Sequence, residues 1–292
     1  MTTAEGVRPR SRRLRAAVFV LFLVGLFITW EVVKFVGGDP WRLGEWEWRP
    51  PVDIWFATDQ NLPHVWDIAG ALADPWRRNA SDSLFVHLAG KALYTWREAA
   101  IGFALGAVLG MGLAIAFVHS SIMERAFVPY VVASQTIPIV ALAPMIVFFV
   151  GASVQAVVII ATYLTFFPVT IAMLRGLRSP DPRAMELMRS YAASRRMVLW
   201  KLRLPASLPY LFTALKITAT ASIVGAIIGE GPGGVHEGLG WSIIEFNQTY
   251  ITAPERLWAA IFVTSLLGIG FYTLVRLVEL RVLRSRPEAS AG

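Results

Sequence analysis

The sequence predicts an all-α integral membrane protein with about six transmembrane helices. Hydrophobic residues make up 55% of the 292 positions and charged residues only 16%, whereas an average soluble domain is roughly 25% charged. The apolar residues form long runs, and several of these reach the roughly 20 residues that a helix needs to cross the hydrocarbon layer. Basic and acidic residues concentrate in alternate connecting segments, which is typical of a chain threaded through a bilayer.

The predicted spans are expected to be helices because backbone groups in the bilayer core find no water to bond. The first span follows a basic segment and ends before Gly37 and Gly38. It is longer than the apolar part of a signal peptide and no clean A-x-A site follows, so we expect it to be retained. A tight outer turn, residues 151–153, separates the third span from the fourth. The spans cover residues 16–36, 99–118, 126–150, 153–174, 209–229 and 257–278.

A long polar stretch rich in Trp and Pro, residues 37–97, follows the first span. Part of it, residues 84–97, has apolar side chains at helical spacing, and we expect this part to lie along the membrane surface. Glu31 and Lys34 are expected to pair with each other or to extend towards the interface. The chain thus divides into an amino-terminal part with the first span and outer segment (1–97), a core domain (98–280) and a carboxy-terminal tail (281–292).

The charge distribution predicts that both termini are cytoplasmic. By the positive-inside rule, about 18 Lys and Arg against about 6 Asp and Glu fall in the inner segments 1–15, 119–125, 175–208 and 276–292. The outer segments 37–97 and 229–256 hold about 7 basic and about 12 acidic residues on the same rule. Topology and contact with membrane lipid account for the net charge of +7. The basic residues form no continuous face with aromatic residues between them, which argues against nucleic-acid binding.

The cytoplasmic loop 175–208 is too long for a simple connection. Asp181 and Pro182 form a helix start, with an N-cap and a first-turn proline. A stripe of apolar residues on the short helix that follows opposes a charged face, and a second short helix is expected at about 195–203. The stripe consists of Met185, Met188, Tyr191 and Ala192, and the charged face of Arg183, Glu186 and Arg189. Such helices either lie among the lipid headgroups or dock into the groove of a partner protein.

This loop resembles that of inner-membrane permeases of binding-protein-dependent ABC importers, written E-A-A, three residues, G, nine residues, I-x-L-P. Glu186, Leu187 and Met188 occupy the E-A-A positions when Pro205 is the final proline. Alanine stands in place of the motif's glycine, and two larger residues replace its alanines. The remaining positions of the loop motif are Ala192 with its neighbour Ala193, then Leu202, Leu204 and Pro205. A literal E-A-A at 98–100 does not fit, because the same spacing reaches Ala116 and Phe117 instead of Leu-Pro.

Further stretches resemble the taurine, aliphatic sulfonate and nitrate branch of these permeases: SQTIPIVALAPMIVFFVG (134–151), LPASLPYLFTALK (204–216), GAIIGE (225–230) and GLGWSI (238–243). Together with SYAASRR and FNQTYITAPERLWAAI, they are most similar to members associated with riboflavin or hydroxymethylpyrimidine uptake. The resemblance covers residues 84–280 and implies the type I ABC importer permease fold.

The resemblance also implies a mechanism and a set of partners. Two permease chains, a homodimer or a pair with a similar chain, would form the pathway in the cytoplasmic (inner) membrane. Cytoplasmic ATPase subunits would hold ATP and Mg, leaving no cofactor on this chain, and an extracytoplasmic binding protein would deliver the solute. The loop helix with Glu186 would sit in a cleft of each ATPase. The solute would be riboflavin or a pyrimidine vitamin precursor, or else a sulfonate, taurine or nitrate.

Polar groups inside the spans are candidates for the solute pathway. Proline within a membrane helix frees carbonyl groups that line cavities or pack on neighbours, and Pro138 and Pro144 follow a polar triplet. Interhelical hydrogen bonding is the alternative role for such residues. The candidates are Ser134, Gln135 and Thr136 in the third span, and Thr218 and Ser222 in the fifth. The glycine-rich stretch 229–240 is expected to form an outer re-entrant turn at the pathway mouth or a contact with the binding protein.

Catalysis and metal binding on this chain are not expected. There is no cysteine, no G-x-x-x-x-G-K-[ST] phosphate-binding loop, and the four histidines show no metal-ligand spacing. The alternative to an importer subunit is an ion- or proton-coupled secondary transporter. Such transporters keep ionisable residues in mid-membrane, whereas the predicted spans carry almost none, with Lys216 and Glu230 placed near span ends.

Overall fold

The computed structural model describes residues 12–43, 46–77, 80–231 and 235–284. The predicted basic start, with Arg8 and Arg10, and the end of the predicted tail lie outside these residues. Two compact units are present, one formed by Met1–Ser81 with Phe246–Ala259 and the other by Asp82–Glu245 with Ala260–Gly292. The first unit contains α1 (Arg12–Gly37), an antiparallel hairpin of β1 (Trp41–Leu43) and β2 (Trp46–Trp48), and α2 (Val65–Ala73).

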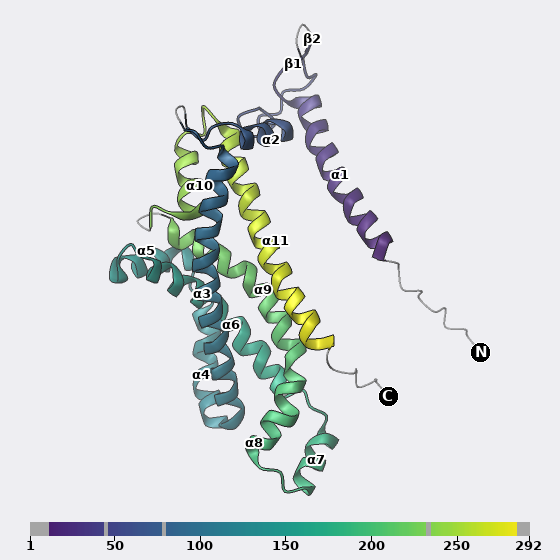
Figure 1. Cartoon of the computed structure of the whole chain (residues 1–292), viewed down its shortest axis with the longest axis vertical. Coiled ribbons are helices and arrows are strands. Elements are labelled where there is room, and N and C mark those ends of the chain that lie inside the picture. Colours follow the sequence, from purple (N-terminus) through teal and green to yellow (C-terminus); the bar gives the residue numbers. More distant parts are fainter. Residues whose placement is uncertain (1–11, 44–45, 78–79, 232–234, 285–292) are drawn as a thin grey trace, which may run out of the picture. The chain divides into compact units, whose positions relative to one another are not determined.

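The second unit is helical in its described residues and holds the remaining elements, except the first turns of the last helix and the last turn of the one before it (Figure 1). In chain order the elements are α3 (Leu84–His119), α4 (Ser121–Ser134), α5 (Ile139–Val150), α6 (Val154–Leu177), α7 (Pro182–Ser190), α8 (Arg195–Val198), the π-helical η1 (Leu199–Arg203), α9 (Leu204–Glu230), α10 (Gly238–Gln248) and α11 (Pro254–Arg284).

The predicted membrane fold is confirmed. Within the described residues, five helices are long and apolar enough to cross a bilayer, and a bent pair of helices brings the number to six if it counts as one span. The five are Ala17–Gly37, Leu84–His119, Val154–Leu177, Arg195–Glu230 and Pro254–Arg284.

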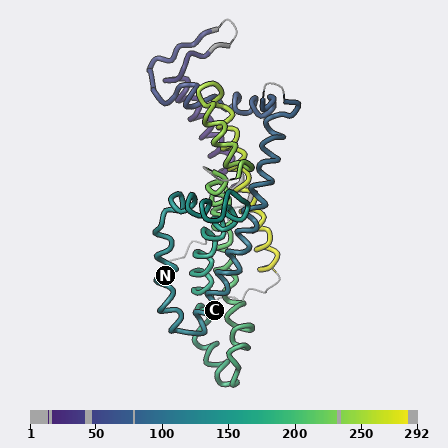
Figure 2. Tube along the Cα trace, turned by 90° about the vertical axis from the view of Figure 1, so that its left-hand side faces the viewer, coloured from purple at the N-terminus to yellow at the C-terminus, as the bar shows by residue number. Residues whose placement is uncertain are grey.

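Two predicted elements are wrong in form. Residues 84–97 do not make a separate surface helix, because α3 continues unbroken from its Ser83 cap, whose side chain accepts a hydrogen bond from the Val86 N–H at 3.4 Å. The predicted span 126–150 is not one continuous helix but the pair α4 and α5, which are bent by 98° relative to each other (Figure 2). Pro138 explains this break, since proline has no N–H to donate and disfavours helical backbone at the residue before it.

The carboxy-terminal end of α1 is tied to the segment that follows it. Lys34 is fully buried, and its Nζ donates to Asp59 and to the Leu62 carbonyl, the latter at 2.6 Å. Glu31 instead bonds the His64 ring at 2.7 Å and accepts from the Val65 N–H at 3.1 Å. The expectation that Glu31 and Lys34 pair with each other or reach the interface is therefore wrong, because each finds a partner about 30 residues further along the chain.

The core of the second unit is α6, which packs against α3 on one side and α9 on another (Figure 1). Three glycines one turn apart on α3, Gly102, Gly106 and Gly110, lie against α6 so closely that added Cβ atoms would come within 2.4 to 2.7 Å of it. From α9, Gly225 and Gly229 approach the Cα atoms of Ala161 and Val157, where added Cβ atoms would lie at 3.0 Å. Small residues permit such close backbone approach, which drives helix association where lipid removes the hydrophobic drive.

Replacing Gly106 by Val should separate α3 from α6, because the new Cβ would lie 2.5 Å from Thr165 Cβ. We expect a loss of about 3 kcal/mol, the upper end of the usual cost of overpacking a core, measured by thermal unfolding in detergent. Gly112→Val is the control on the same helix, since nothing lies within 4 Å of an added Cβ there. Equal losses in the two variants would contradict the packing described.

Candidate functional site

The predicted coupling segment 175–208 forms two helical pieces joined by a tight turn. Asp181 caps α7 by accepting a hydrogen bond from the Arg183 N–H at 2.7 Å, and Pro182 begins the helix, as predicted. At the other end, the Ala192 N–H donates to the Arg189 carbonyl and the Ala193 N–H to the Met188 carbonyl, at 2.9 and 3.0 Å. This is the Schellman pattern, which requires left-handed backbone at the residue after the cap. Ala192 supplies it with a φ of 50°.

The outer face of this segment is exposed and partly apolar. Glu186 is exposed, and beside it Leu187 is 57% exposed. Tyr191 and Trp200 are 77% and 70% exposed, while Met185 and Met188 are half-buried. Large apolar side chains that stay exposed amid arginines are typical of a surface that binds another protein. The predicted apolar stripe is therefore divided, with its methionines facing inward and Tyr191 facing out.

The second piece is continuous with a core helix. Ser194 caps α8 by accepting from the Met197 N–H at 3.3 Å, and α8, η1 and α9 follow one another without a gap. Leu199 and Leu204 pack on a buried cluster that includes Phe117 of α3 and Met173 of α6. Leu202 and Pro205 are half-buried. A force on the exposed piece would therefore reach α9 directly, and through the cluster also α3 and α6.

The candidate pathway residues fall into two groups. Ser134, Gln135 and Thr136 form the end of α4 and the break before α5, where the Tyr163 hydroxyl of α6 donates to the Ser134 carbonyl. Gln135 Nε2 is buried without a hydrogen-bond partner among the described residues. Thr218 and Ser222 are fully buried, and their hydroxyls donate to carbonyls of their own helix, at 3.0 Å to Ala214 and 2.9 Å to Ala219. Both hydroxyls therefore bond within α9, and neither is exposed in the single chain; their predicted place along the pathway stays a prediction.

A buried polar network on α3 was missed by the sequence reasoning. Lys91, Thr95 and Glu98 lie on one face at helical spacing, and the first two engage the region around the start of α10. Lys91 Nζ pairs with Glu237 at 2.6 Å, and Thr95 Oγ1 accepts from the Leu239 N–H at 2.8 Å. The fully buried Glu230, at the end of α9, accepts from the Gly240 N–H at 2.7 Å.

Glu98 and Glu230 are also electrostatic neighbours, so two buried carboxyl groups meet where α3, α9 and α10 come together. Lys216 likewise lies inside α9, paired with Glu279 of α11 at 2.8 Å. Glu98, Lys216 and Glu230 therefore belong to helices that are longer than the predicted spans, and these helices carry more ionisable groups than the span interiors do. The helical spacing of Lys91, Thr95 and Glu98 was the available signal, but the sequence reasoning assigned residues 84–97 to a separate surface helix and did not reveal that α3 continues unbroken past Glu98. Of the glycine-rich stretch, residues 232–234 lie outside the described residues.

The described residues include no group of three or more His, Asp or Glu arranged to hold a metal ion.

Comparison with known proteins gives a consistent family. Residues 106–284 match the protein family described as the binding-protein-dependent transport system inner membrane component. The chain is 33% identical over 271 residues to the formylaminopyrimidine transport permease protein ThiX of Halalkalibacterium halodurans, covering 92% of this chain and 95% of that one. It is 29% identical to the riboflavin transport system permease protein RibX of Chloroflexus aurantiacus, covering 72% of this chain and 75% of that one.

Among solved structures, a chain of the MetNI methionine ABC transporter in an inward-facing conformation aligns with a TM-score of 0.53. The alignment covers 69% of this chain and 95% of that chain at 22% sequence identity, so the likeness concerns the fold.

Replacing Ala192 by Gly should stabilise the protein by about 1 kcal/mol. Removing the side chain relieves the roughly 1–2 kcal/mol that left-handed backbone costs an L-residue, but the greater conformational entropy of glycine in the unfolded chain offsets part of this gain. Thermal unfolding in detergent measures the change. Ala193→Gly is the control, since Ala193 is not among the described residues with positive φ, and it should be neutral or slightly destabilising. A stabilisation that is no larger at 192 than at 193 would contradict the turn geometry.

Replacing Thr95 by Val keeps the shape of the side chain but leaves the buried Leu239 N–H without an acceptor. The expected cost is about 1–3 kcal/mol of unfolding free energy, because an unsatisfied buried donor loses its solvation. Faster amide exchange at the start of α10 should accompany it. Thr213→Val is the control, because the exposed Thr213 hydroxyl bonds only its own helix at Pro209. If both variants behave alike, Thr95 does not hold α10.

Proposed function

The chain belongs to the family of binding-protein-dependent transport system inner membrane components, and on that basis we propose that α7, α8 and η1 form the surface through which it engages an ATPase partner. As a multi-pass inner-membrane permease of an ABC importer, it is not itself the ATPase. The secondary-transporter alternative is overturned by this family membership.

The observation that carries the proposal is the backbone at Ala192. In the family's loop motif this position is a glycine, and here the residue has a φ of 50°, a conformation that favours glycine. The agreement supports the motif register in which Glu186, Leu187 and Met188 form the first part and Leu202, Leu204 and Pro205 the end. Glu186 and Leu187 are then the exposed contacts, with Ala193 completing the turn.

Coupling would proceed by movement of packed helices. When two ATPase subunits close on ATP and Mg, α7 is displaced with the ATPase cleft, and η1 transmits the displacement to α9. Leu199 and Leu204 pack on the apolar cluster that also contains residues of α3 and α6, so those two helices would move together with α9. A binding protein on the other side of the membrane delivers solute to the outward-open state, and each state is stabilised by its own ligand or nucleotide.

The remaining assignments are part of the same proposal. Both termini face the cytoplasm, as the excess of Lys and Arg in segments 1–15, 119–125, 175–208 and 276–292 supports. Two permease chains, as a homodimer, enclose the pathway. Ser134, Gln135 and Thr136 line it at the break between α4 and α5, where Gln135 Nε2 has no protein partner among the described residues. The core domain 98–280, with its loop 175–208, carries these functions.

For the solute we propose a pyrimidine vitamin precursor, with riboflavin second and sulfonate, taurine or nitrate after it. The support is that the formylaminopyrimidine transport permease is 33% identical to this chain, while the riboflavin relative is 29% identical. Stimulation of ATP hydrolysis in the reconstituted importer, tested separately with an aminopyrimidine, riboflavin and taurine, distinguishes the three.

Glu186→Lys should leave membrane insertion intact and uncouple ATP hydrolysis from transport, because it places a like charge among the arginines of the coupling surface. We expect at least about a tenfold loss of solute-stimulated ATP hydrolysis in proteoliposomes, the effect of losing one central interface contact. Glu47→Lys, the same charge reversal at an exposed position of the first unit, is the control. Normal coupling in a properly inserted Glu186→Lys protein would refute the docking register.

A further inference from the structure

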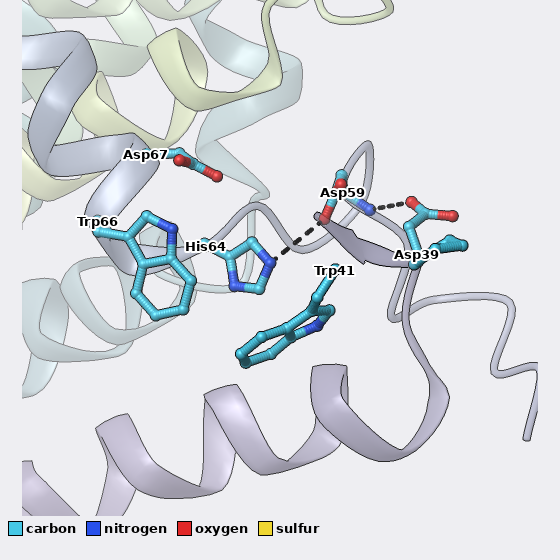
Figure 3. Close-up of a pocket in the computed structure, with 7 residues that line it drawn as sticks. Asp39, Trp41, Asp59, His64, Trp66 and Asp67 are labelled. Atoms are coloured by element: carbon cyan, nitrogen blue, oxygen red, sulfur yellow. Dashed lines mark hydrogen bonds and ion pairs between the residues drawn. The ribbon is translucent and has the colours of Figure 1, made fainter. Parts of the chain in front are cut away.

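The first unit contains a pocket that the coupling mechanism does not use. Its cavity has a volume of about 810 Å³ and lies between the hairpin and the start of α2 (Figure 3). This volume falls within the roughly 300–1,000 Å³ typical of small-molecule sites. The lining combines two indole rings and an imidazole with three carboxylates: Asp39, Pro40, Trp41, Asp59, His64, Trp66 and Asp67.

The aromatic side of the pocket is a preformed corner. The His64 ring stacks on Trp66 with centroids 4.3 Å apart and an interplanar angle of 12°. Trp41 meets both rings edge-on, at 4.7 Å from His64 and 5.7 Å from Trp66. Trp66 remains 48% exposed, so ring surface is available to a ligand. Indole faces carry negative electrostatic potential and attract cations, particularly flat ones that can also stack.

The polar side of the pocket is acidic. Asp39 accepts from the Asp59 N–H at 2.6 Å, and Asp59 in turn pairs with the buried Lys34, which neutralises one carboxylate. No hydrogen bond or ion pair engages the exposed Asp67 carboxylate among the described residues. An adjoining cavity of about 580 Å³ shares Asp59, Trp66 and Asp67 and adds two more carboxylates, Asp74 and Glu255. Neither cavity has a Lys or Arg among its described lining residues.

The pocket is also held rigidly from behind. His64 is fixed by Glu31 at 2.7 Å, Trp30 Nε1 donates to the Pro63 carbonyl at 3.0 Å, and Lys34 holds Asp59 and the Leu62 carbonyl. All three anchoring residues come from the carboxy-terminal end of α1. Preorganisation of this kind lowers the entropy cost of binding and is characteristic of sites for small ligands.

We propose that this pocket binds a small planar organic cation, such as an amidinium or a protonated amino-heterocycle. The flat charged group lies against the exposed face of Trp66 and donates an N–H to Asp67, while Trp41 and the free oxygen of Asp39 line the other side of the pocket (Figure 3). The preformed aromatic corner favours such a molecule over a basic segment of a protein, which would need only an acidic surface. The binding itself does not depend on the proposed coupling; only the placement of the pocket on the extracytoplasmic side rests on that function.

The test uses the purified full-length chain in detergent, titrated by calorimetry with benzamidinium and, separately, with benzamide, which has nearly the same shape and no charge. We expect saturable one-site binding of benzamidinium and at least about tenfold weaker binding of benzamide, because the carboxylates and indole faces act on the charge. No ATPase or binding protein is needed, so failure of this proposal and failure of the coupling proposal are distinguishable.

Substitutions of pocket residues test whether benzamidinium binds in this pocket. Asp67→Asn should weaken benzamidinium binding about threefold to tenfold, as expected for the loss of one charge-assisted hydrogen bond at an open site. Trp66→Leu should weaken it comparably by removing the stacking face. Asp53→Asn makes the same charge change at an exposed residue of the same unit that does not line the pocket, and it should bind as the parent does.

Three results would overturn the proposal. One is equal affinity for benzamidinium and benzamide. Another is an affinity that Asp67→Asn and Trp66→Leu both leave unchanged while their unfolding temperatures match the parent's. The third is tight binding of tetralysine with no binding of benzamidinium, which would assign the acidic groove to a basic protein surface instead.

Discussion

The close approach of α3 and α9 to α6 is the constraint on which the second unit depends. Because lipid tails are as apolar as the side chains, burying a side chain between helices gains no hydrophobic free energy. Close van der Waals packing between helix backbones therefore has to hold the helices together. Glycines supply that contact from both sides of α6, and Ala161 faces Gly102 of α3 as well as Gly225 of α9. Because these faces admit no added Cβ without displacement, the three helices can move as one body but cannot slide freely past each other.

This close packing would let the proposed coupling segment act on the three helices together, while polar residues hold the ends of the helices in place. The last part of this segment, α8 and η1, runs without a gap into α9. At the opposite end of α9, Glu230 accepts a hydrogen bond from the Gly240 N–H in the first turn of α10. Thr95 of α3 accepts one from the neighbouring Leu239 N–H. A displacement of one end of α9 would therefore move the other end as well. Rearrangement there would disturb buried carboxyl groups, which costs free energy and favours a few distinct arrangements over a continuous range.

The sequence predicted those features of the fold that depend on residues close together in the chain. Apolar run length located the spans, and Asp181 with Pro182 located the start of α7, because caps and prolines act through neighbouring backbone. The 98° bend between α4 and α5 was missed, although Pro138 was noted, because a proline shows where a helix can break and not by how much. The pairing of Lys34 with Asp59 and the meeting of Glu98 with Glu230 join residues 25 or more positions apart, which no helical spacing reveals. The glycines on α3 were visible, but which helix they face depends on tertiary packing.

The most direct test of the account is site-specific cross-linking, which this cysteine-free chain permits without background. A Leu187→Cys variant, joined to its importer partners, labelled on its one thiol with a short maleimide–diazirine reagent and irradiated, should form a covalent product with the ATPase subunit, because the carbene inserts into whatever side chain lies beside it. Phe148→Cys is the control, since Phe148 is 83% exposed and lies on α5, outside the coupling segment. A product at position 187, changed in yield by ATP and absent at 148, is the result predicted. Absence of the product at 187 in a complex that still hydrolyses ATP on addition of solute would contradict the account.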